Sequence, residues 1–188
     1  QSASSEAARV PATRKLNPTT DARMLVLLGT RLAFAAMAAA CAALLGVGYY
    51  LQFVDGLEPC PMCIFQRVCY MAVVAIAAVA ALHGPGRLGQ RVYSALLALP
   101  VLIGLGVAAR QTWLQHLPED QVPECGPGLS FMLEMYAPFE VLKRTLRGTG
   151  DCAKVDWTFL GLSIAEWSVI CFATLLIVLV LWLLGVFH

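Results

Sequence analysis

Residues 64–82 read IFQRVCYMAVVAIAAVAAL and contain one charged residue, Arg67, close to their start. An α-helix rises ~1.5 Å per residue, so a run of this length crosses the ~30 Å hydrocarbon core of a bilayer. Lipid offers no hydrogen bonds to the backbone, and a helix satisfies its own N–H and C=O groups. The stretch therefore predicts a transmembrane helix.

Three further apolar segments surround it, at residues 32–51, 92–109 and 167–187. The chain is 59% hydrophobic and 13% charged, whereas soluble domains carry about 25% charged residues. We expect an all-α integral membrane protein, a four-helix bundle in a single domain over residues 24–188. Residues 1–23, rich in Ser, Ala, Thr and Pro, are expected to form a flexible tail rather than a secretory signal, because the apolar run that follows is too long.

The third segment contains three residues that affect helix packing. Pro100 is expected to kink the helix, and Gly104 and Gly106 permit close contact with a neighbour.

The distribution of Lys and Arg predicts the orientation in the membrane. The N-terminal region carries five basic residues up to Arg31, and the 83–91 loop carries Arg87 and Arg91, whereas residues 52–62 carry none. Both termini are therefore expected in the cytoplasm. The loops at 52–63 and 111–163 are expected on the outer side. A net charge of +1 gives no basis for nucleic-acid binding.

This orientation divides the seven cysteines into two groups. Cys41, Cys69 and Cys171 fall inside apolar segments, where a cysteine usually behaves as a small hydrophobic residue. The others fall on the outer side, where disulfides persist. These outer cysteines are Cys60, Cys63, Cys125 and Cys152.

Cys60-Pro61-Met62-Cys63 lies where the second helix is expected to begin. Unpaired N–H groups and the macrodipole at a helix N-terminus stabilise a thiolate. Arg67 follows Cys63 by four residues, so both lie on one helical face. A charged residue within a membrane helix requires a partner, and a Cys63 thiolate or a ligand carbonyl would be one. The alternative for Arg67 is an interfacial anchor that reaches the headgroups.

Cys125 and Cys152 lie in Gly-rich loops. If they pair, they close a 27-residue loop, which stabilises a fold by roughly 3–4 kcal/mol. Structural disulfides are therefore one interpretation of the outer cysteines, and a zinc site is another, but the second pair lacks short zinc-knuckle spacing. No metal is expected. Between these cysteines, the apolar spacing over residues 131–144 predicts a short amphipathic helix in the outer interface, interrupted at Pro138.

The sequence resembles the DsbB family of bacterial membrane proteins over residues 31–185. The resemblance rests on four helices, the Cys-x-x-Cys that opens the second, Arg67 four residues later and a Cys pair in the second outer loop. Further family-like runs are Pro59-Cys60, Cys63-Ile64-Phe65-Gln66-Arg67, Gly150-Asp151-Cys152 with Trp157, and Phe159-Leu160-Gly161-Leu162 with Trp167.

The resemblance implies a quinone-dependent protein-disulfide oxidoreductase in the bacterial inner membrane, with its active cysteines in the periplasm. A reduced DsbA-like thioredoxin-fold protein would attack Cys125, whose former partner is Cys152. Exchange with a Cys60–Cys63 disulfide would follow, and Cys63 would pass the electrons to ubiquinone or menaquinone beside Arg67. A polar quinone partner is also expected at the outer end of the third helix, where the sequence offers Arg110, Trp113 and His116.

Two other functions fit parts of the pattern. A relative of vitamin K epoxide reductase would also be a four-helix, quinone-linked thiol enzyme, but its Cys-x-x-Cys normally opens the last helix rather than the second. A membrane scaffold protein would use both disulfides as braces. In that case the disulfides would resist mild dithiols and Arg67 would be dispensable.

Overall fold

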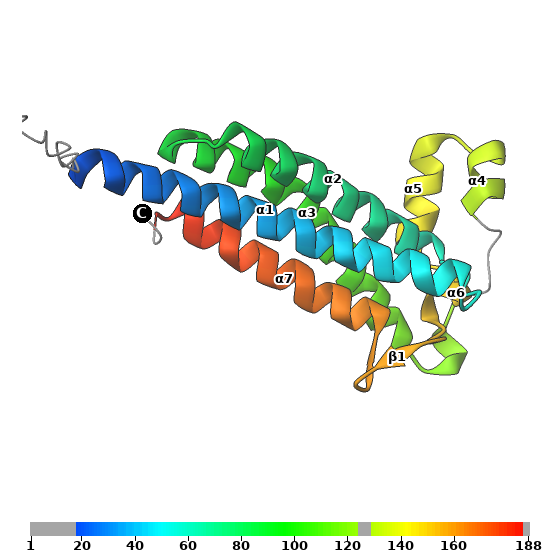
Figure 1. Ribbon diagram of the computed structural model, residues 1–188. Coiled ribbons are helices and arrows are strands. Elements are labelled where there is room, and N and C mark those ends of the chain that lie inside the picture. Colours follow the sequence, from blue (N-terminus) through cyan, green and yellow to red (C-terminus); the bar gives the residue numbers. More distant parts are fainter. Residues whose placement is uncertain (1–17, 124–128, 186–188) are drawn as a thin grey trace, which may run out of the picture.

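Four long helices form the body of the protein in the computed structural model, which describes residues 18–123 and 129–185 (Figure 1). They are α1 (Pro18–Phe53), α2 (Pro61–His83), α3 (Arg87–Gln115) and α7 (Ile164–Leu183). Each contains a stretch long and apolar enough to cross a membrane, and in α1 this stretch is Leu28–Phe53. The predicted all-α, four-span membrane bundle is confirmed.

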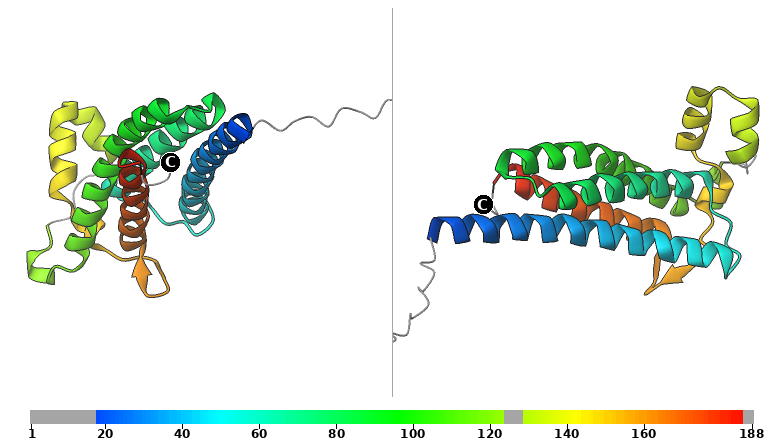
Figure 2. Two further views of the ribbon diagram at one scale, coloured as in Figure 1. Left: turned by 90° about the vertical axis from the view of Figure 1, so that its left-hand side faces the viewer. Right: turned by 45° about the horizontal axis from the view of Figure 1, so that its top comes forward.

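The four helices pack in a chain of neighbours. α1 packs against α2, α2 against α3, and α3 against α7, and the view along the bundle shows this arrangement (Figure 2). α1 and α7 also meet, through the rings of Phe34 and Trp182, and both contribute to the cavity described below.

All the short elements lie at one end of the bundle, opposite the start of α1 and the end of α7 (Figures 1 and 2). They are η1 (Glu119–Gln121), α4 (Leu129–Met135), α5 (Pro138–Arg147), α6 (Gly150–Ala153) and the antiparallel hairpin of β1 (Thr158–Phe159) and β2 (Leu162–Ser163). The helix expected over residues 131–144 is present as α4 and α5. It is interrupted at Ala137, whose ψ of 148° is extended, because a residue that precedes proline disfavours the helical conformation.

Several predicted boundaries were too narrow. α1 begins at Pro18, inside the expected tail, because proline suits the first helical turn. α3 begins at Arg87 and ends at Gln115, so it extends beyond the apolar run at both ends, and α2 already begins at Pro61.

The last helix and the segment before it also differ from the prediction. α7 begins at Ile164 rather than residue 167, because Ser163 and Glu166 form a capping box there. The segment around Cys152, expected to be a loop, is the short helix α6.

The bundle has two ends, named here the outer end, which carries the short elements, and the inner end, where α2 ends and α3 begins. Its middle and inner parts are tightly packed. Phe34 and Trp182 lie edge to face at 4.8 Å between ring centroids, and Tyr70 stacks on Phe172 at 4.2 Å. A Cβ on Gly104 would overlap the Phe172 ring, so this glycine allows α3 and α7 to approach closely, as predicted, whereas Gly106 has open space. Large apolar side chains on the outside, such as Leu82 at 78% exposed, face the lipid.

The inner end of α2 is closed by a glycine and an arginine. Gly84 adopts φ +62° and donates its N–H to Ala80 O. Arg31 of α1 donates from Nε to Ala81 O and from Nη2 to Leu82 O, both at 2.9 Å. The last carbonyls of α2 therefore have partners.

Candidate redox site

The Cys-x-x-Cys forms the N-terminus of α2. Cys60 is the N-cap residue, and its Sγ accepts a hydrogen bond from the backbone N–H of Cys63 at 3.3 Å. Pro61 occupies the first turn, where its missing N–H costs nothing. Cys60 Sγ and Cys63 Sγ are 3.0 Å apart. A small side-chain rotation would join them in a disulfide, and the predicted position at a helix start is confirmed.

Cys152 meets Cys60 from α6, although 92 positions separate them in the sequence (152 − 60). Cys152 is 1% exposed and lies in one buried cluster with Cys60 and Met62. Interaction with the Cys60 thiol lowers the pKa of Cys152 to about 6, against the opposing effect of burial, with help from the backbone N–H groups of Thr149 and Met62. The Met62 N–H belongs to the first turn of α2, which suits an anion. Cys152 is therefore the sulfur of this pair that holds negative charge.

Cys60 has the opposite character. Its hydrogen bonds to Cys152 and then to Cys63, together with burial, raise the pKa of Cys60 above its ordinary value. A protonated Cys60 lies between two other sulfurs, so this end of the bundle brings three cysteines into one connected group. Cys125, the fourth cysteine singled out from the sequence, lies outside the described residues.

Two buried glutamine side chains border the same sulfurs. Gln66 on α2 and Gln111 on α3 are each 3% exposed, and Gln66 Nε2 donates to Gln111 Oε1 at 2.7 Å. Gln111 Nε2 lies 3.2 Å from Cys63 Sγ and 3.4 Å from Cys60 Sγ. Neither glutamine was predicted from the sequence as a site residue. Their amide side chains at the edges of the apolar segments could have indicated a functional role, because a polar group in a membrane helix is costly unless it has a partner.

Arg67 lies one turn deeper than Cys63 and is held by α1. Its guanidinium donates to Gln52 Oε1 and, at 2.9 Å, to Gly48 O, and it lies 4.9 Å from the Tyr49 ring centroid. The partners predicted from the sequence were a Cys63 thiolate or a ligand. The structure adds acceptors on α1, which hold Arg67 at the edge of the cavity described next.

A cavity of about 560 Å³ opens beside Cys60, Cys63 and Arg67. This volume is within the range of small-molecule sites. Apolar residues of α1 and α7, including Leu44, Val47 and Ile164, form much of its wall. The remaining lining comes from residues 57–60, from α2, from Gln111 and Gln115 of α3, and from the 151–163 segment with Trp157 and Phe159.

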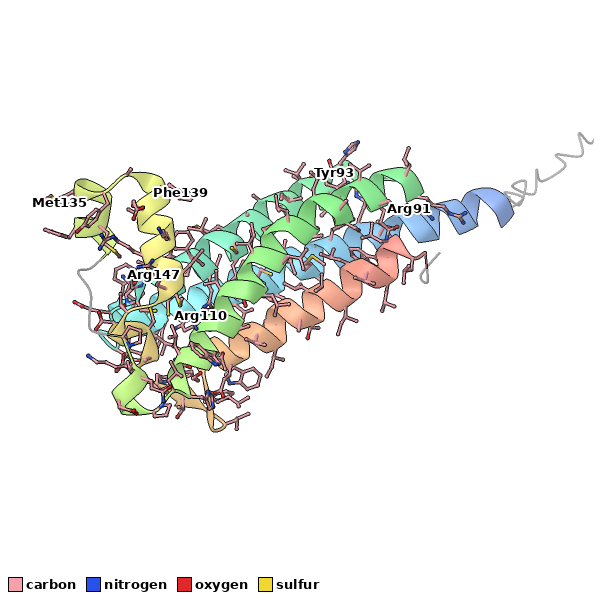
Figure 3. All side chains as sticks on the ribbon, turned by 180° about the vertical axis from the view of Figure 1, so that it is seen from behind. Arg91, Tyr93, Arg110, Met135, Phe139 and Arg147 are labelled. Carbon is pink, nitrogen blue, oxygen red and sulfur yellow. The ribbon has the colours of Figure 1, made fainter. Side chains whose placement is uncertain are left out.

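The three residues considered as quinone partners on α3 do not line this cavity. Arg110 donates to the carbonyls of Leu146 and Arg147 and lies 4.2 Å from the Trp113 ring centroid. Figure 3 shows Arg110 beside Arg147 of α5. His116 lies 3.7 Å from Glu166 at the start of α7. The helix period instead brings Gln111 and Gln115 to the cavity.

The three cysteines within the spans differ in their surroundings, and Cys171 lines the cavity. Cys41 and Cys69 are 1% and 7% exposed and belong to the apolar core, as expected. Cys171 is half-buried. Across the described residues, no group of three His, Cys, Asp or Glu side chains has the arrangement of a metal site.

A four-span bundle that gathers cysteines at a helix N-terminus, next to a cavity walled by membrane helices, defines a membrane thiol–disulfide oxidoreductase. Residues 30–182 match the family described as Disulfide bond formation protein DsbB. The chain belongs to the DsbB family, the membrane proteins that reoxidise DsbA with the help of a quinone. The vitamin K epoxide reductase alternative and the scaffold alternative are therefore wrong.

Similar proteins named Disulfide bond formation protein B occur in several bacteria. The protein of Aromatoleum aromaticum is 54% identical over 142 residues, which cover 76% of this chain and 85% of that protein. The protein of Azoarcus sp. is 54% identical over 151 residues, covering 80% and 90%. The protein of Chromobacterium violaceum is 48% identical over 155 residues, covering 82% and 93%.

Proposed function

We propose that this chain takes two electrons from a reduced periplasmic DsbA-like protein and passes them through Cys125–Cys152 and Cys60–Cys63 to a membrane quinone. The observation that supports this route is the contact of Cys152 with Cys60, and of Cys60 with Cys63, at the N-terminus of α2. Cys60 and Cys63 line the cavity, whereas Cys152 reaches Cys60 from the side of α6.

The first exchange involves the outer pair. A thiolate of the partner attacks the Cys125 sulfur, the Cys125–Cys152 bond breaks, and the electron pair leaves on Cys152. A thiolate leaves and attacks most readily where its pKa is low. When Cys60 is itself in a disulfide, the backbone N–H groups of Thr149 and Met62 remain as donors to the Cys152 thiolate.

The second exchange involves the inner pair. Cys152 attacks Cys60, the Cys152–Cys60 bond forms, the Cys60–Cys63 bond breaks, and the electron pair leaves on Cys63. The partner's second thiolate then resolves its mixed disulfide and releases Cys125. Cys125 attacks Cys152, which restores Cys125–Cys152 and releases Cys60. The partner has gained a disulfide, and Cys60 and Cys63 hold both electrons.

The cavity fits a quinone headgroup, because its wall is mainly apolar and carries the Arg67 guanidinium next to the reactive cysteines. A bound quinone, whether ubiquinone or menaquinone, supplies the acceptor for two electrons and two protons. Cys63 on the wall delivers the electrons, and Arg67 stabilises negative charge on this thiolate and on the reduced ring. A guanidinium has five N–H donors, so the bonds to Gln52 and Gly48 do not exhaust it.

The proposed orientation puts these cysteines in the periplasm and both termini in the cytoplasm. Arg91 lies at the opposite end of the bundle from Phe139 and Met135 of the α4–α5 region (Figure 3). Arg31 and Arg87 are at the same inner end as Arg91. Such clustering of basic residues favours the cytoplasmic side.

The proposal is tested by oxidation of a reduced DsbA-like protein by the purified chain in lipid nanodiscs. A short-tailed ubiquinone analogue is followed by its ultraviolet absorbance. We expect one quinone consumed per partner disulfide formed, and Cys63→Ser should abolish this turnover. Cys69→Ala, a buried change on the same helix, is the matched control and should retain it. Partner oxidation without quinone consumption would contradict the proposal.

A further inference from the structure

Gln111 is the polar side chain of α3 that reaches the reactive sulfurs. Its amide nitrogen lies within hydrogen-bond distance of both Cys60 Sγ and Cys63 Sγ, at 3.4 and 3.2 Å. At 3% exposed, the amide has exchanged water for these partners. Burial of an amide is costly unless each of its groups is hydrogen-bonded.

The quality of those bonds depends on the redox state of the cysteines. Sulfur in a thiol or a disulfide is a weak acceptor, whereas hydrogen bonds to an ionised group are roughly twice as strong as neutral ones. A buried N–H aimed at Cys63 therefore gains most when Cys63 is a thiolate. The Gln111 oxygen lies 3.7 Å from Cys63 Sγ, which gives the protonated thiol an acceptor on the same amide.

Gln66 determines which end of the Gln111 amide faces the sulfurs. Its Nε2 donates to Gln111 Oε1 at 2.7 Å, and both side chains are buried. With the Gln66 amide oriented as observed, a reversed Gln111 amide would bring its NH₂ group against the NH₂ group of Gln66, where neither can accept. The pair thus directs N–H toward Cys60 and Cys63, and Oε1 toward Gln66.

We propose that Gln111 is a catalytic residue of the exchange between Cys152 and Cys60, and that its amide N–H stabilises the Cys63 thiolate released in that step. The inference rests on the proposed function. As Cys152 bonds to Cys60 and the Cys60–Cys63 bond breaks, the electron pair arrives on Cys63 Sγ, next to the Gln111 N–H. A donor already oriented toward developing charge accelerates its formation. Gln66 is a positioning residue that acts through Gln111.

The same contact affects the equilibrium of the Cys60–Cys63 pair. A group that binds the thiolate better than the disulfide stabilises the reduced form, and a stabilised reduced form makes the disulfide a stronger oxidant. Gln111 thereby makes it easier for the inner pair to accept electrons from the outer pair. Because the Gln111 amide is neutral, it does not stabilise the reduced cysteines so strongly that transfer of the electrons to an acceptor in the cavity would be hindered.

The test measures the reducibility of the inner pair in the full chain, in a Cys125→Ser/Cys152→Ser background and without added quinone. The protein is equilibrated with dithiothreitol redox buffers, and thiols are counted by alkylation. Gln111→Met keeps side-chain length and removes the donor. We expect its equilibrium constant for reduction to fall about 10- to 100-fold, the effect of one hydrogen bond to a charged group. Gln66→Met should produce a smaller fall in the same direction.

Gln90→Met is the matched control, because Gln90 is a buried glutamine, 4% exposed, at the inner end of the same helix. It should leave the equilibrium unchanged. If Gln111→Met folds with the melting temperature of Gln90→Met and shifts the equilibrium less than about twofold, the inference is overturned. If Gln111→Met does not fold, Gln66→Met decides in the same way.

This readout is independent of the proposed function. Loss of quinone-coupled turnover in the unmodified chain would overturn the proposed function, whatever the thiol equilibrium. An unmodified chain that turns over, with an equilibrium indifferent to Gln111 and Gln66, would overturn the inference alone.

Discussion

The unpaired backbone groups at the two ends of α2 are both capped by side chains, but the chemistry of the two caps differs. At the inner end Arg31 donates to the carbonyls of Ala81 and Leu82. At the outer end the cap is a sulfur, and Cys60 Sγ accepts from the Cys63 N–H. The arginine cap has one charge state, because a guanidinium stays protonated. In the proposed function the sulfur cap changes its bonds as electrons pass.

The packing around these ends differs in the same way. The inner and middle parts of the bundle are filled by aromatic and aliphatic side chains such as Phe34, Phe172 and Trp182. The outer end combines a cavity of about 560 Å³ with three neighbouring sulfurs. A rigid apolar core thus holds helix ends whose positions determine the distances between reacting atoms.

The largest expected effect separates the two cysteine pairs. Cys152→Ser should abolish oxidation of a DsbA-like protein, because no thiolate then reaches Cys60 from α6. Quinone reduction by dithiothreitol should persist, since Cys60 and Cys63 still line the cavity. Parallel assays of partner thiols and quinone absorbance measure both. Partner oxidation at the rate of the unmodified chain would show that electrons bypass Cys152.

The next effect compares Arg67, which lies on α2 and binds α1, with Arg31, which lies on α1 and binds α2. Arg67→Met should lower kcat/KM for the quinone about 10- to 100-fold, the effect of losing a hydrogen bond to developing charge. Arg31→Met should leave this constant unchanged and lower the melting temperature, at a cost of about 1 kcal/mol because Arg31 is exposed. Equal kinetic losses in both variants would mean that Arg67 only supports the fold.

A smaller effect probes the packed part of the bundle. Gly104→Ala puts a methyl group into the Phe172 ring and should destabilise the protein by about 1–3 kcal/mol. Gly106→Ala meets open space on the same helix and should be neutral or slightly stabilising. Thermal unfolding in detergent compares them, and turnover per folded molecule should be the same. If the two variants were equally stable, α3 and α7 would be able to move apart at Gly104 without a cost in the free energy of unfolding.

The smallest effect concerns the pH at which Cys152, at the outer end, reacts at half its maximal rate. In the reduced Cys125→Ser chain, alkylation of Cys152 should be half-maximal near pH 6, because its pKa is lowered to about 6. Below that pH the thiolate fraction should fall about tenfold per unit, and above it the rate should level off. Cys60→Ala removes the principal donor and should move the midpoint upward. Peptide mass spectrometry measures both, and a midpoint near the ordinary thiol value of about 8.5 would contradict the assignment.

Much of this architecture was predictable because it depends on local sequence. Apolar runs of about 20 residues define the spans, and the Cys-Pro-Met-Cys sequence combines an N-cap with a first-turn proline. The Arg67 position follows from helical spacing. The helix ends were predicted less well, since apolar runs mark the lipid-embedded portion and α1 and α3 continue beyond it.

The sequence by itself determined the membrane-spanning class, the placement of Cys60 and Cys63 at a helix start, and the family. Only the tertiary structure decided that Cys152 reaches Cys60, that Arg67 binds Gln52 and Gly48 of α1, and that Gln111 faces the sulfurs. Local patterns record helix period and solvent preference. Contacts between elements depend on how the helices pack and rotate against one another, which no single segment specifies.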